Sequence, residues 1–163
     1  MVQYHMEIDI RYLNEKDLDV LEEDIRNMWC KHHLNNKSLI SQDTLKNTDL
    51  HKYFKRSIKR QKGFSLIAIV DEEVAGIIRV AEEPLEDFFN YKRAYIVDDL
   101  VIKTEFRRQG IATALLDRVK EIAKEKGVGV LKARIYTFNE PAQSFFEEKG
   151  FDQLYGEYFN TLD

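Results

Sequence analysis

Residues 94–127 read AYIVDDLVIKTEFRRQGIATALLDRVKEIAKEKG, and this stretch decides the fold. It begins with an apolar run from Ala94 to Ile102 that only two aspartates interrupt, which predicts a strand. After a short turn, apolar residues recur at spacings of three and four, which predicts an amphipathic helix over Arg108 to Lys126. A strand that leads through a glycine-containing turn into a long helix indicates an α/β protein.

The flanking sequence predicts further strands and helices on both sides of this unit. Two β-rich runs separated by the polar residues Asp71 to Glu73 predict an antiparallel hairpin. Together with the central strand, the predicted strands cover Met6–Leu13, Phe64–Val70, Val74–Val80, Ala94–Ile102, Gly129–Thr137 and a last segment near Phe151–Phe159. The other predicted helices cover Glu15–Cys30, Thr44–Arg60 and Asn139–Lys149. With 163 residues and no repeat or linker, residues 1–163 are expected to form a single domain.

The composition is that of a folded globular protein, with 44% hydrophobic and 33% charged residues and only two prolines. The net charge of −4 gives no general attraction to polyanions, so nucleic acid is not expected as a partner, and the basic run Lys52–Lys62 is interpreted as a solvated helix face. A single cysteine, Cys30, excludes an internal disulfide framework. The N-terminus lacks a signal core, and no apolar run reaches the ~20 residues that cross a bilayer, so we expect a cytoplasmic protein without a membrane anchor.

The turn before the long helix, Arg107-Arg108-Gln109-Gly110-Ile111-Ala112, has the features of a phosphate-binding loop. The first N–H groups of a helix lack partners within the helix and carry a partial positive charge, so this turn can hold an anion. The two arginines add charge-assisted donors, and the small residues Gly110 and Ala112 leave room for a ligand. Two common nucleotide-binding motifs, Gly-Lys-Ser/Thr and Gly-x-Gly-x-x-Gly, do not occur in the chain. A pyrophosphate on a nucleotide-like molecule is the expected ligand, and a basic helix start without a ligand is the alternative.

Two segments of the chain resemble the signatures of the GNAT superfamily of N-acetyltransferases, and they occur in the same order as in that family. The family's pyrophosphate loop, Arg/Gln-x-x-Gly-x-Gly/Ala after a strand ending Leu-x-Val, is similar to Arg107–Ala112 after Leu100–Ile102. Its second signature, an Asn and an Ala before aromatic-Glu-x-x-Gly-Phe, is matched by Asn139, Ala142, Phe146, Glu147, Gly150 and Phe151. The resemblance implies a mixed α/β (α+β) fold whose mostly antiparallel sheet has six to seven strands, is splayed between strands 4 and 5, and is flanked by about four helices. It also implies acetyl-coenzyme A (acetyl-CoA) as cosubstrate, an amine as acceptor, and no metal.

The same resemblance assigns donor-binding roles residue by residue. Leu100, Val101 and Ile102 would pair with the pantetheine arm through their backbone while their side chains pack in the core, and the N–H near Leu100 would polarise the thioester carbonyl. The residues expected at the pyrophosphate are Arg107, Arg108, Gln109, Gly110, Ile111, Ala112 and Thr113. Asn139 would cap the helix that follows it, contact the donor, or do both.

Phe146 is a departure from the family pattern, and it is expected close to the donor sulfur. Many members carry a tyrosine at this point, where it protonates the leaving thiolate. Either the thiolate leaves without an acid, or a tyrosine elsewhere supplies the proton. Tyr155 is the catalytic candidate, with Tyr158 and Tyr136 as alternatives.

The adjacent carboxylates of Asp98 and Asp99 are the candidate catalytic and acceptor-binding groups. An ammonium has no lone pair to attack a thioester, and a free alkylamine has a pKa near that of lysine, about 10.4, so some group must accept a proton. Carboxylates within an apolar strand are costly unless they face a wet or charged cavity. In a regular strand the two side chains point to opposite faces, a limit that a β-bulge removes. The pair resembles the Glu-Asp pair of diamine acetyltransferases, and the alternative is an ion pair with Arg79 or Arg134.

These features favour transfer of an acetyl group to the primary amine of a small molecule, of polyamine or amino-sugar type, by direct attack in a ternary complex. A protein or peptide amine is the second hypothesis, and a non-catalytic acyl-CoA sensor, which Phe146 favours, is the third. Cys30, His32 and His33 lie close in sequence but lack the spacing of a metal site, so they receive no role. A homodimer that pairs through the last strand is left open.

Overall fold

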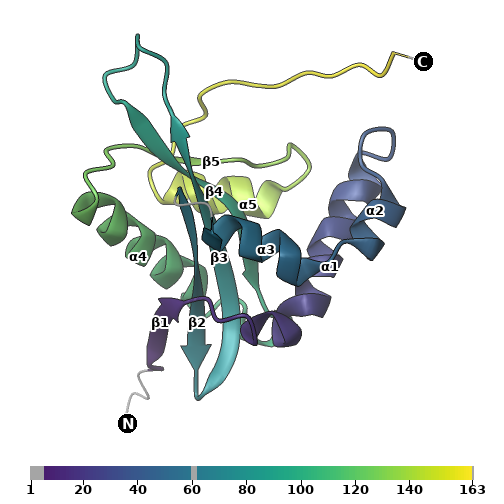
Figure 1. Cartoon of the computed structure of the whole chain (residues 1–163), viewed down its shortest axis with the longest axis vertical. Helices are drawn as coiled ribbons and strands as arrows, with labels where there is room; N and C mark the ends of the chain where they lie inside the picture. The colour runs from purple at the N-terminus through teal and green to yellow at the C-terminus, as the bar shows by residue number, and fades with distance from the viewer. Residues whose placement is uncertain (1–5, 60–61, 163) are drawn as a thin grey trace.

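The computed structural model describes residues 6–59 and 62–162 (Figure 1). Its strands are β1 (Ile8–Tyr12), β2 (Gly63–Val70), β3 (Glu73–Pro84), β4 (Arg93–Ile102) and β5 (Leu131–Ala133). Its helices are α1 (Asp17–Asn35), α2 (Gln42–Asn47), α3 (Leu50–Lys59), α4 (Ile111–Glu125) and α5 (Glu140–Glu148), with a 3-10 turn, η1, over Thr104–Phe106. The predicted mixed α/β architecture is confirmed.

The strands of the described residues form one five-stranded sheet in the order β1-β2-β3-β4-β5. The first three pairings are antiparallel, as the predicted hairpin β2–β3 requires, and β5 joins β4 in parallel. β5 pairs with β4 over three residues only, from Tyr95–Leu131 to Val97–Ala133. Beyond Val97, β4 therefore continues with one open edge.

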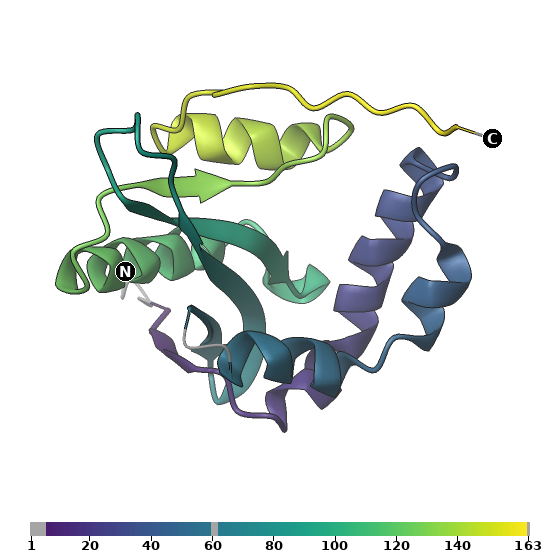
Figure 2. The ribbon, with the colours of Figure 1, turned by 45° about the horizontal axis from the view of Figure 1, so that its top comes forward.

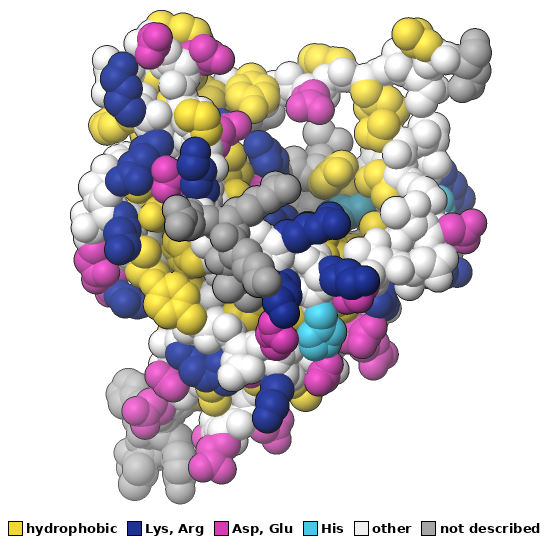
Figure 3. Space-filling view, viewed as in Figure 1, with side chains coloured by type: hydrophobic (Ala, Val, Ile, Leu, Met, Phe, Trp, Pro, Cys, Tyr) yellow, Lys and Arg dark blue, Asp and Glu magenta, His cyan; other side chains and the backbone are white. Residues whose placement is uncertain are grey.

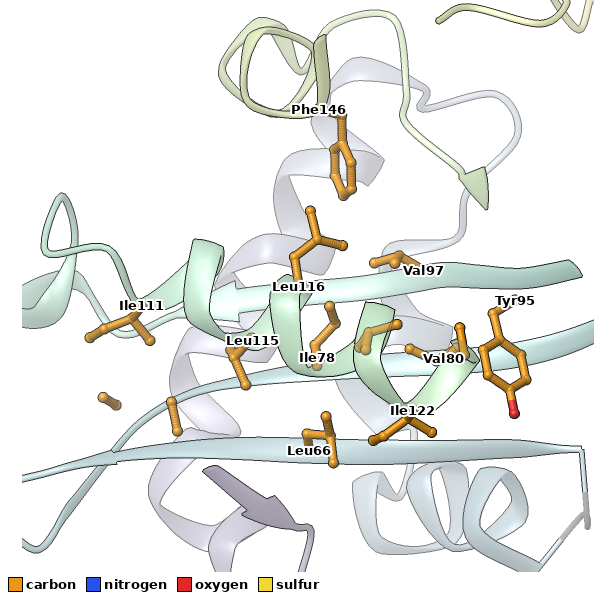
Figure 4. Close-up of a cluster of buried hydrophobic side chains, with 14 of the residues drawn as sticks. Leu66, Ile78, Val80, Tyr95, Val97, Ile111, Leu115, Leu116, Ile122 and Phe146 are labelled. Atoms are coloured by element: carbon orange, nitrogen blue, oxygen red, sulfur yellow. The ribbon is translucent and has the colours of Figure 1, made fainter. Parts of the chain in front are cut away.

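Helices cover both faces of the sheet (Figure 2). On one face, Leu115 and Ile122 of α4 lie over Leu66, Ile78 and Val80 of the sheet, and Leu116 of α4 points toward Phe146 of α5 (Figure 4). On the other face, α1 and α3 bury an apolar cluster against the sheet, made of Leu18, Leu21, Ile25, Trp29, Leu50, Phe54, Ile67, Ile77 and Val101. Neighbouring strand residues feed opposite clusters, as the two-residue period of a strand dictates. The sheet is thus held between two apolar layers.

Two helix predictions differ from the structure. α1 ends at Asn35 instead of near Cys30, and the helix expected over Thr44–Arg60 is replaced by α2 and α3. Each of the two has its own cap: the Ser41 hydroxyl accepts the N–H of Thr44 at 3.2 Å, and the Asp49 carboxylate accepts the N–H of Lys52 at 3.0 Å. A side chain that caps a helix start satisfies N–H groups that would otherwise lack partners, so the break falls between these caps.

The last predicted strand, near Phe151–Phe159, is wrong: residues 151–162 lie in no helix or strand. The sheet of the described residues therefore has five strands, and not six to seven. β5 is only three residues long and offers almost no backbone ladder to a sixth strand. The segment extends away from the sheet in Figure 1, and it leaves Leu154 and Tyr158 63% and 97% exposed.

Candidate active site

β4 carries a β-bulge at Asp98. Arg79 of β3 pairs with Asp99, but the next residue, Val80, pairs with Val97, so Asp98 has no partner of its own. A bulge leaves one extra residue on a strand and re-aims its side chain. As a result, the carboxylates of Asp98 and Asp99 line the same cavity.

Both carboxylates are paired with arginines. Asp99, which is 7% exposed, accepts a hydrogen bond from Nε of Arg79. Asp98 accepts one from Nη1 of Arg134 at 3.1 Å, and its other oxygen lies 3.7 Å from Nη1 of Arg79. The alternative in which one aspartate meets an arginine therefore holds for both. Neither carboxylate is a bare negative charge.

Tyr53 of α3 holds the far side of Arg79. Its hydroxyl accepts a hydrogen bond from Nη2 of Arg79 at 2.8 Å, and the guanidinium lies 4.9 Å from the centre of the phenol ring. Burial, supported by the nearby charge of Asp99, raises the pKa of Tyr53 to about 12. This phenol therefore stays protonated at neutral pH and positions Arg79 as a neutral partner.

Past the bulge, β5 no longer pairs with β4, so one edge of β4 faces a gap in the sheet. The last link between the two strands is the hydrogen bond from the N–H of Arg134 to the carbonyl of Val97, at 3.2 Å. On the other side, the N–H of Lys103, just after β4, donates to the carbonyl of Ala75 in β3 at 2.9 Å. Because successive residues of an antiparallel ladder turn their backbone groups to opposite sides, those of Leu100 and Ile102 point to the open edge. The predicted splay between strands 4 and 5 is confirmed.

A cavity of about 460 Å³ opens at this edge, and we call it the β4 cavity. Its wall comes from residues 97–100 of β4, residues 134–136 after β5, the start of α5, and the helices α1 to α3. The volume lies within the range of ~300–1,000 Å³ that is typical of small-molecule sites. Figure 3 shows this face of the molecule hollowed between the sheet and the α1–α2 side.

His32, for which no role was predicted because it lacks the spacing of a metal ligand, belongs to the wall of the β4 cavity. Its ring lies 4.6 Å from the ring of Tyr136 and 5.5 Å from that of Phe138. Burial lowers the pKa of His32 below its ordinary value of 6.5, and the charge of Asp99 opposes this shift in part. Within residues 6–59 and 62–162, neither ring nitrogen has a hydrogen-bond partner. The imidazole is therefore neutral at pH 7 with its lone pair available.

The turn predicted to bind a phosphate lies between β4 and α4. Gly110 precedes α4 with a φ of 78°, and Arg108 has a φ of 60°, a region that residues other than glycine rarely adopt. Gly110 has no side chain to cap the helix, and the first helical bond joins the N–H of Ala114 to its carbonyl at 3.0 Å. The N–H groups of residues 111–113 therefore face outward at the positive end of the helix dipole.

The space in front of these N–H groups is open, which suits a large anion. A Cβ built at Gly110 would meet nothing within 4 Å. Arg107, Arg108 and Gln109 are exposed around the turn. Arg107 donates from Nε to the carbonyl of Ile102 at 3.1 Å, and Gln109 donates from its amide to the carbonyl of Glu105 at 3.1 Å. The predicted loop residues are thus assembled at one helix start.

Residues 23–151 match the model of the acetyltransferase (GNAT) family. The chain belongs to this family. The GNAT assignment made from the two sequence signatures is confirmed, since the match includes both.

Curated relatives of this GNAT protein are acetyltransferases. A thialysine N-epsilon-acetyltransferase of Bos taurus is 28% identical over 71 residues, 41% of this chain and 42% of that enzyme. The chain therefore matches less than half the length of this relative. N-alpha-acetyltransferase 30 of Schizosaccharomyces pombe is 28% identical over 117 residues, 70% of this chain and 74% of that protein.

A solved structure supports the same fold. The aminoglycoside N-acetyltransferase AAC(6')-Iy, solved in complex with CoA, aligns with a TM-score of 0.75 and 16% identity over 99% of both chains. At this identity the likeness shows the fold alone. The same protein has also been solved with a bisubstrate analogue that joins CoA to an acetylneamine.

Of the remaining residues predicted for the site, the structure brings some to the β4 cavity and leaves others away from it. Asn139 caps α5, because its side-chain oxygen accepts the N–H of Ala142 at 3.2 Å, and it also lines the β4 cavity. Phe146 is 5% exposed, packs in the core, and forms part of the cavity wall. Tyr155 does not line the cavity: it lies in the segment 151–162 and is 66% exposed. Tyr136, the alternative tyrosine, does line the cavity.

Other surface features carry no site. Lys52 and Lys55 of α3 are exposed and pair with Asp49 and Glu15, so this part of the basic run is a solvated helix face, where basic side chains gather in Figure 3. Among the described residues, no three or more His, Cys, Asp or Glu side chains are grouped so that they could hold a metal ion. In the same part of the chain, no helix has the length and apolar character needed to cross a membrane.

Proposed function

We propose that this GNAT protein transfers the acetyl group of acetyl-CoA to the primary amine of a small molecule. The observation that carries the proposal is the β4 cavity, which opens where β4 and β5 separate and has the backbone of Leu100 at its edge. The start of α4 follows β4 after a short turn, so a donor could span both. A small-molecule acceptor is supported by the volume of the cavity, about 460 Å³.

The donor would be held mainly by backbone groups. The N–H groups at the start of α4, with Arg107 and Arg108, would bind the pyrophosphate through charge-assisted hydrogen bonds. The open edge of β4 would pair with the pantetheine arm as a missing strand would. The N–H of Leu100 would then donate to the thioester oxygen, where negative charge develops during attack.

The transfer would proceed by direct attack of the amine on the thioester. The amine nitrogen forms a bond to the acetyl carbon, and the bond from that carbon to sulfur breaks. An acceptor that enters as an ammonium loses one proton before attack and a second one after it, and the second balances the proton that the thiolate takes up. His32 would accept the first proton, because it is the imidazole of the cavity wall and burial, which lowers its pKa, keeps it neutral. Asp98 would hold the ammonium beforehand.

A protein amino terminus is the second candidate for the acceptor. It is favoured by the relative with the longer match, N-alpha-acetyltransferase 30, which covers 70% of this chain. Small amines are supported by the names of the thialysine and aminoglycoside enzymes. A polyamine or an amino-sugar, the acceptors favoured by the sequence, and a peptide amine therefore belong in one comparison.

The test is to follow free thiol release from acetyl-CoA across polyamines, aminoglycosides, amino acids and short peptides, with product masses confirmed. We expect turnover on at least one small amine, with a fall of at least tenfold in kcat/KM in His32→Gln. Calorimetry with CoA separates donor binding from transfer. Tight CoA binding without turnover on any amine would instead indicate an acyl-CoA sensor, and no CoA binding would refute the proposal.

A further inference from the structure

The charged wall of the β4 cavity is electrically balanced. Among the described residues that line it, the permanent charges are two arginines, Arg79 and Arg134, and two carboxylates, Asp98 and Asp99. Each carboxylate already has an arginine partner. An acceptor with several positive charges would find no free carboxylate here and would be repelled by both guanidinium groups. The wall is therefore poorly suited to a polycation.

The two ion pairs differ in how firmly they are held. The inner pair, Arg79 with Asp99, is buried and fixed by the hydroxyl of Tyr53. The outer pair, Arg134 with Asp98, includes an arginine side chain that is 62% exposed and follows the short strand β5. Asp98 is only 14% exposed, so a ligand opens the outer pair at low cost only if it brings its own cation to that carboxylate.

A ligand that opens this pair must replace its shortest contact, since the charges that remain are farther away: Arg79 lies 3.7 Å from Asp98, and Glu83 lies 3.5 Å from Arg134. The best replacement brings a cation to Asp98 and an anion to Arg134 at hydrogen-bond distance from that cation, since the two side chains lie 3.1 Å apart. An α-amino acid carries its ammonium and its carboxylate on a single carbon and so presents opposite charges at this spacing. Arginine binds carboxylates through two parallel hydrogen bonds, which adds directional preference.

Apart from Thr48, Asn139 and His32, the rest of the wall is apolar and aromatic. Met28 and Trp29 of α1, Leu45 of α2 and Ile135 after β5 contribute to it. A side chain that leaves water for such a wall gains roughly 25 cal/mol per Å² of apolar area. This part of the cavity favours an uncharged, apolar substituent on the acceptor.

We propose that the acceptor is an α-amino acid with an apolar side chain, acetylated on its α-amine. This inference rests on the proposed function and names its substrate class. Asp98 receives the ammonium, Arg134 the carboxylate, and the apolar wall the side chain. The ammonium loses one proton to His32, its nitrogen bonds to the acetyl carbon, the bond from that carbon to sulfur breaks, and the second proton of the nitrogen goes to the thiolate, so that CoA leaves as the thiol. Arg134 acts in acceptor binding and specificity.

The experiment compares matched acceptors that differ only at the carboxylate: phenylalanine, phenylalaninamide and phenethylamine, with spermidine as the polycation. Thiol release gives kcat and KM for each. We expect kcat/KM for phenylalanine to exceed that for phenethylamine at least tenfold. A charge-assisted hydrogen bond contributes about 1.5–3 kcal/mol, which is roughly a 10- to 100-fold change in KM.

Variants identify the residue responsible. Arg134→Gln should raise KM for phenylalanine about tenfold or more, with little change in kcat, while Arg134→Lys recovers part of the loss. Arg118→Gln is the matched control, because Arg118 is a partly exposed arginine on α4 that pairs with Glu121. A thermal melt of each variant confirms that it is folded.

The outcomes separate this inference from the proposed function. Equal or better turnover of phenethylamine or spermidine, or an unchanged phenylalanine KM in Arg134→Gln, overturns the inference and leaves the acetyltransferase activity intact. Absence of turnover on these acceptors, with turnover on an aminoglycoside or a peptide, overturns the inference alone, and absence of turnover on the whole amine panel overturns both. Preference for phenylalanine that disappears only in the Arg134 variants supports the inference.

Discussion

Replacing Arg79 with methionine should destabilise the protein strongly. Asp99 is 7% exposed and would keep a buried negative charge without its partner, at a cost of about 3–5 kcal/mol. The hydroxyl of Tyr53 would also lose the donor that it has at 2.8 Å, which adds about 1 kcal/mol. Because Arg79 retains 16% side-chain exposure, water relieves part of the first cost, and we expect a total near 4 kcal/mol. That is a large share of the ~5–15 kcal/mol stability of a typical domain.

Urea unfolding followed by tryptophan fluorescence measures this loss. Trp29 is buried in the apolar cluster that α1 and α3 form against the sheet, and its ring lies 5.0 Å from that of Tyr53. The double variant Arg79→Met/Asp99→Asn should recover roughly 2 kcal/mol, because it removes the unpaired charge. Arg118→Met is the control, since its exposed pair with Glu121 should contribute less than about 0.5 kcal/mol. An Arg79→Met midpoint no lower than that of the control would refute the assignment of a buried ion pair.

Three further predictions concern the cavity and the phosphate loop. Burial holds the pKa of His32 below its unfolded value of about 6.5, so unfolding below that pH takes up a proton. Wild type should therefore lose stability relative to His32→Gln as pH falls from 6.5. Above pH 6.5 the neutral His32 should keep its full contribution to the free energy of unfolding. Urea midpoints of wild type and His32→Gln between pH 5 and 8 check this. Gly110→Val should lower the CoA affinity measured by calorimetry at least tenfold. A residue with a side chain pays about 1–2 kcal/mol to adopt a φ of 78°, and relief of that strain would shift the start of α4. The control Gly156→Ala, in the extended segment 151–162, should bind CoA as wild type does. Phe146→Ala should cost about 3–5 kcal/mol of stability, since a buried ring that packs between the core and the cavity is removed, whereas Phe146→Leu should cost less than half as much.

The unit from β4 to α4 was predictable because its signals are local. The alternation of apolar residues, the turn glycine and the apolar stripe of the helix each depend on neighbours in sequence. The turn predicted to bind a phosphate belongs to the same stretch, and its residues lie at the start of α4 in the structure. The break between α2 and α3 had a local signal too, because Ser41 and Asp49 each lie three residues before the N–H that they cap.

His32 could not be found from the apolar pattern of α1. That pattern ends at Trp29: none of the α1 residues after it is buried, and of these only His32 lines the β4 cavity. A helix face that lines a cavity is free to carry polar residues, so its periodicity is lost while the helix continues. The arginine partners of Asp98 and Asp99 were also undetermined, since Arg79 and Arg134 come from distant parts of the chain and meet only in the folded sheet.

The bulge at Asp98 makes this residue separable from the fold. Before the bulge, Tyr95 and Val97 pack in the apolar cluster between the sheet and α4. Beyond the bulge, Leu100 and Ile102 pack against that same cluster, and Val101 packs on the opposite face of the sheet. If Asp98 were deleted, regular alternation would carry each of these side chains to the face that it already occupies. Loss of a single codon would then remove one carboxylate from the cavity without exchanging the two faces of the sheet, and insertion of one could restore it. Deletion or insertion of this one codon would therefore change the charge of the cavity without a change in the core.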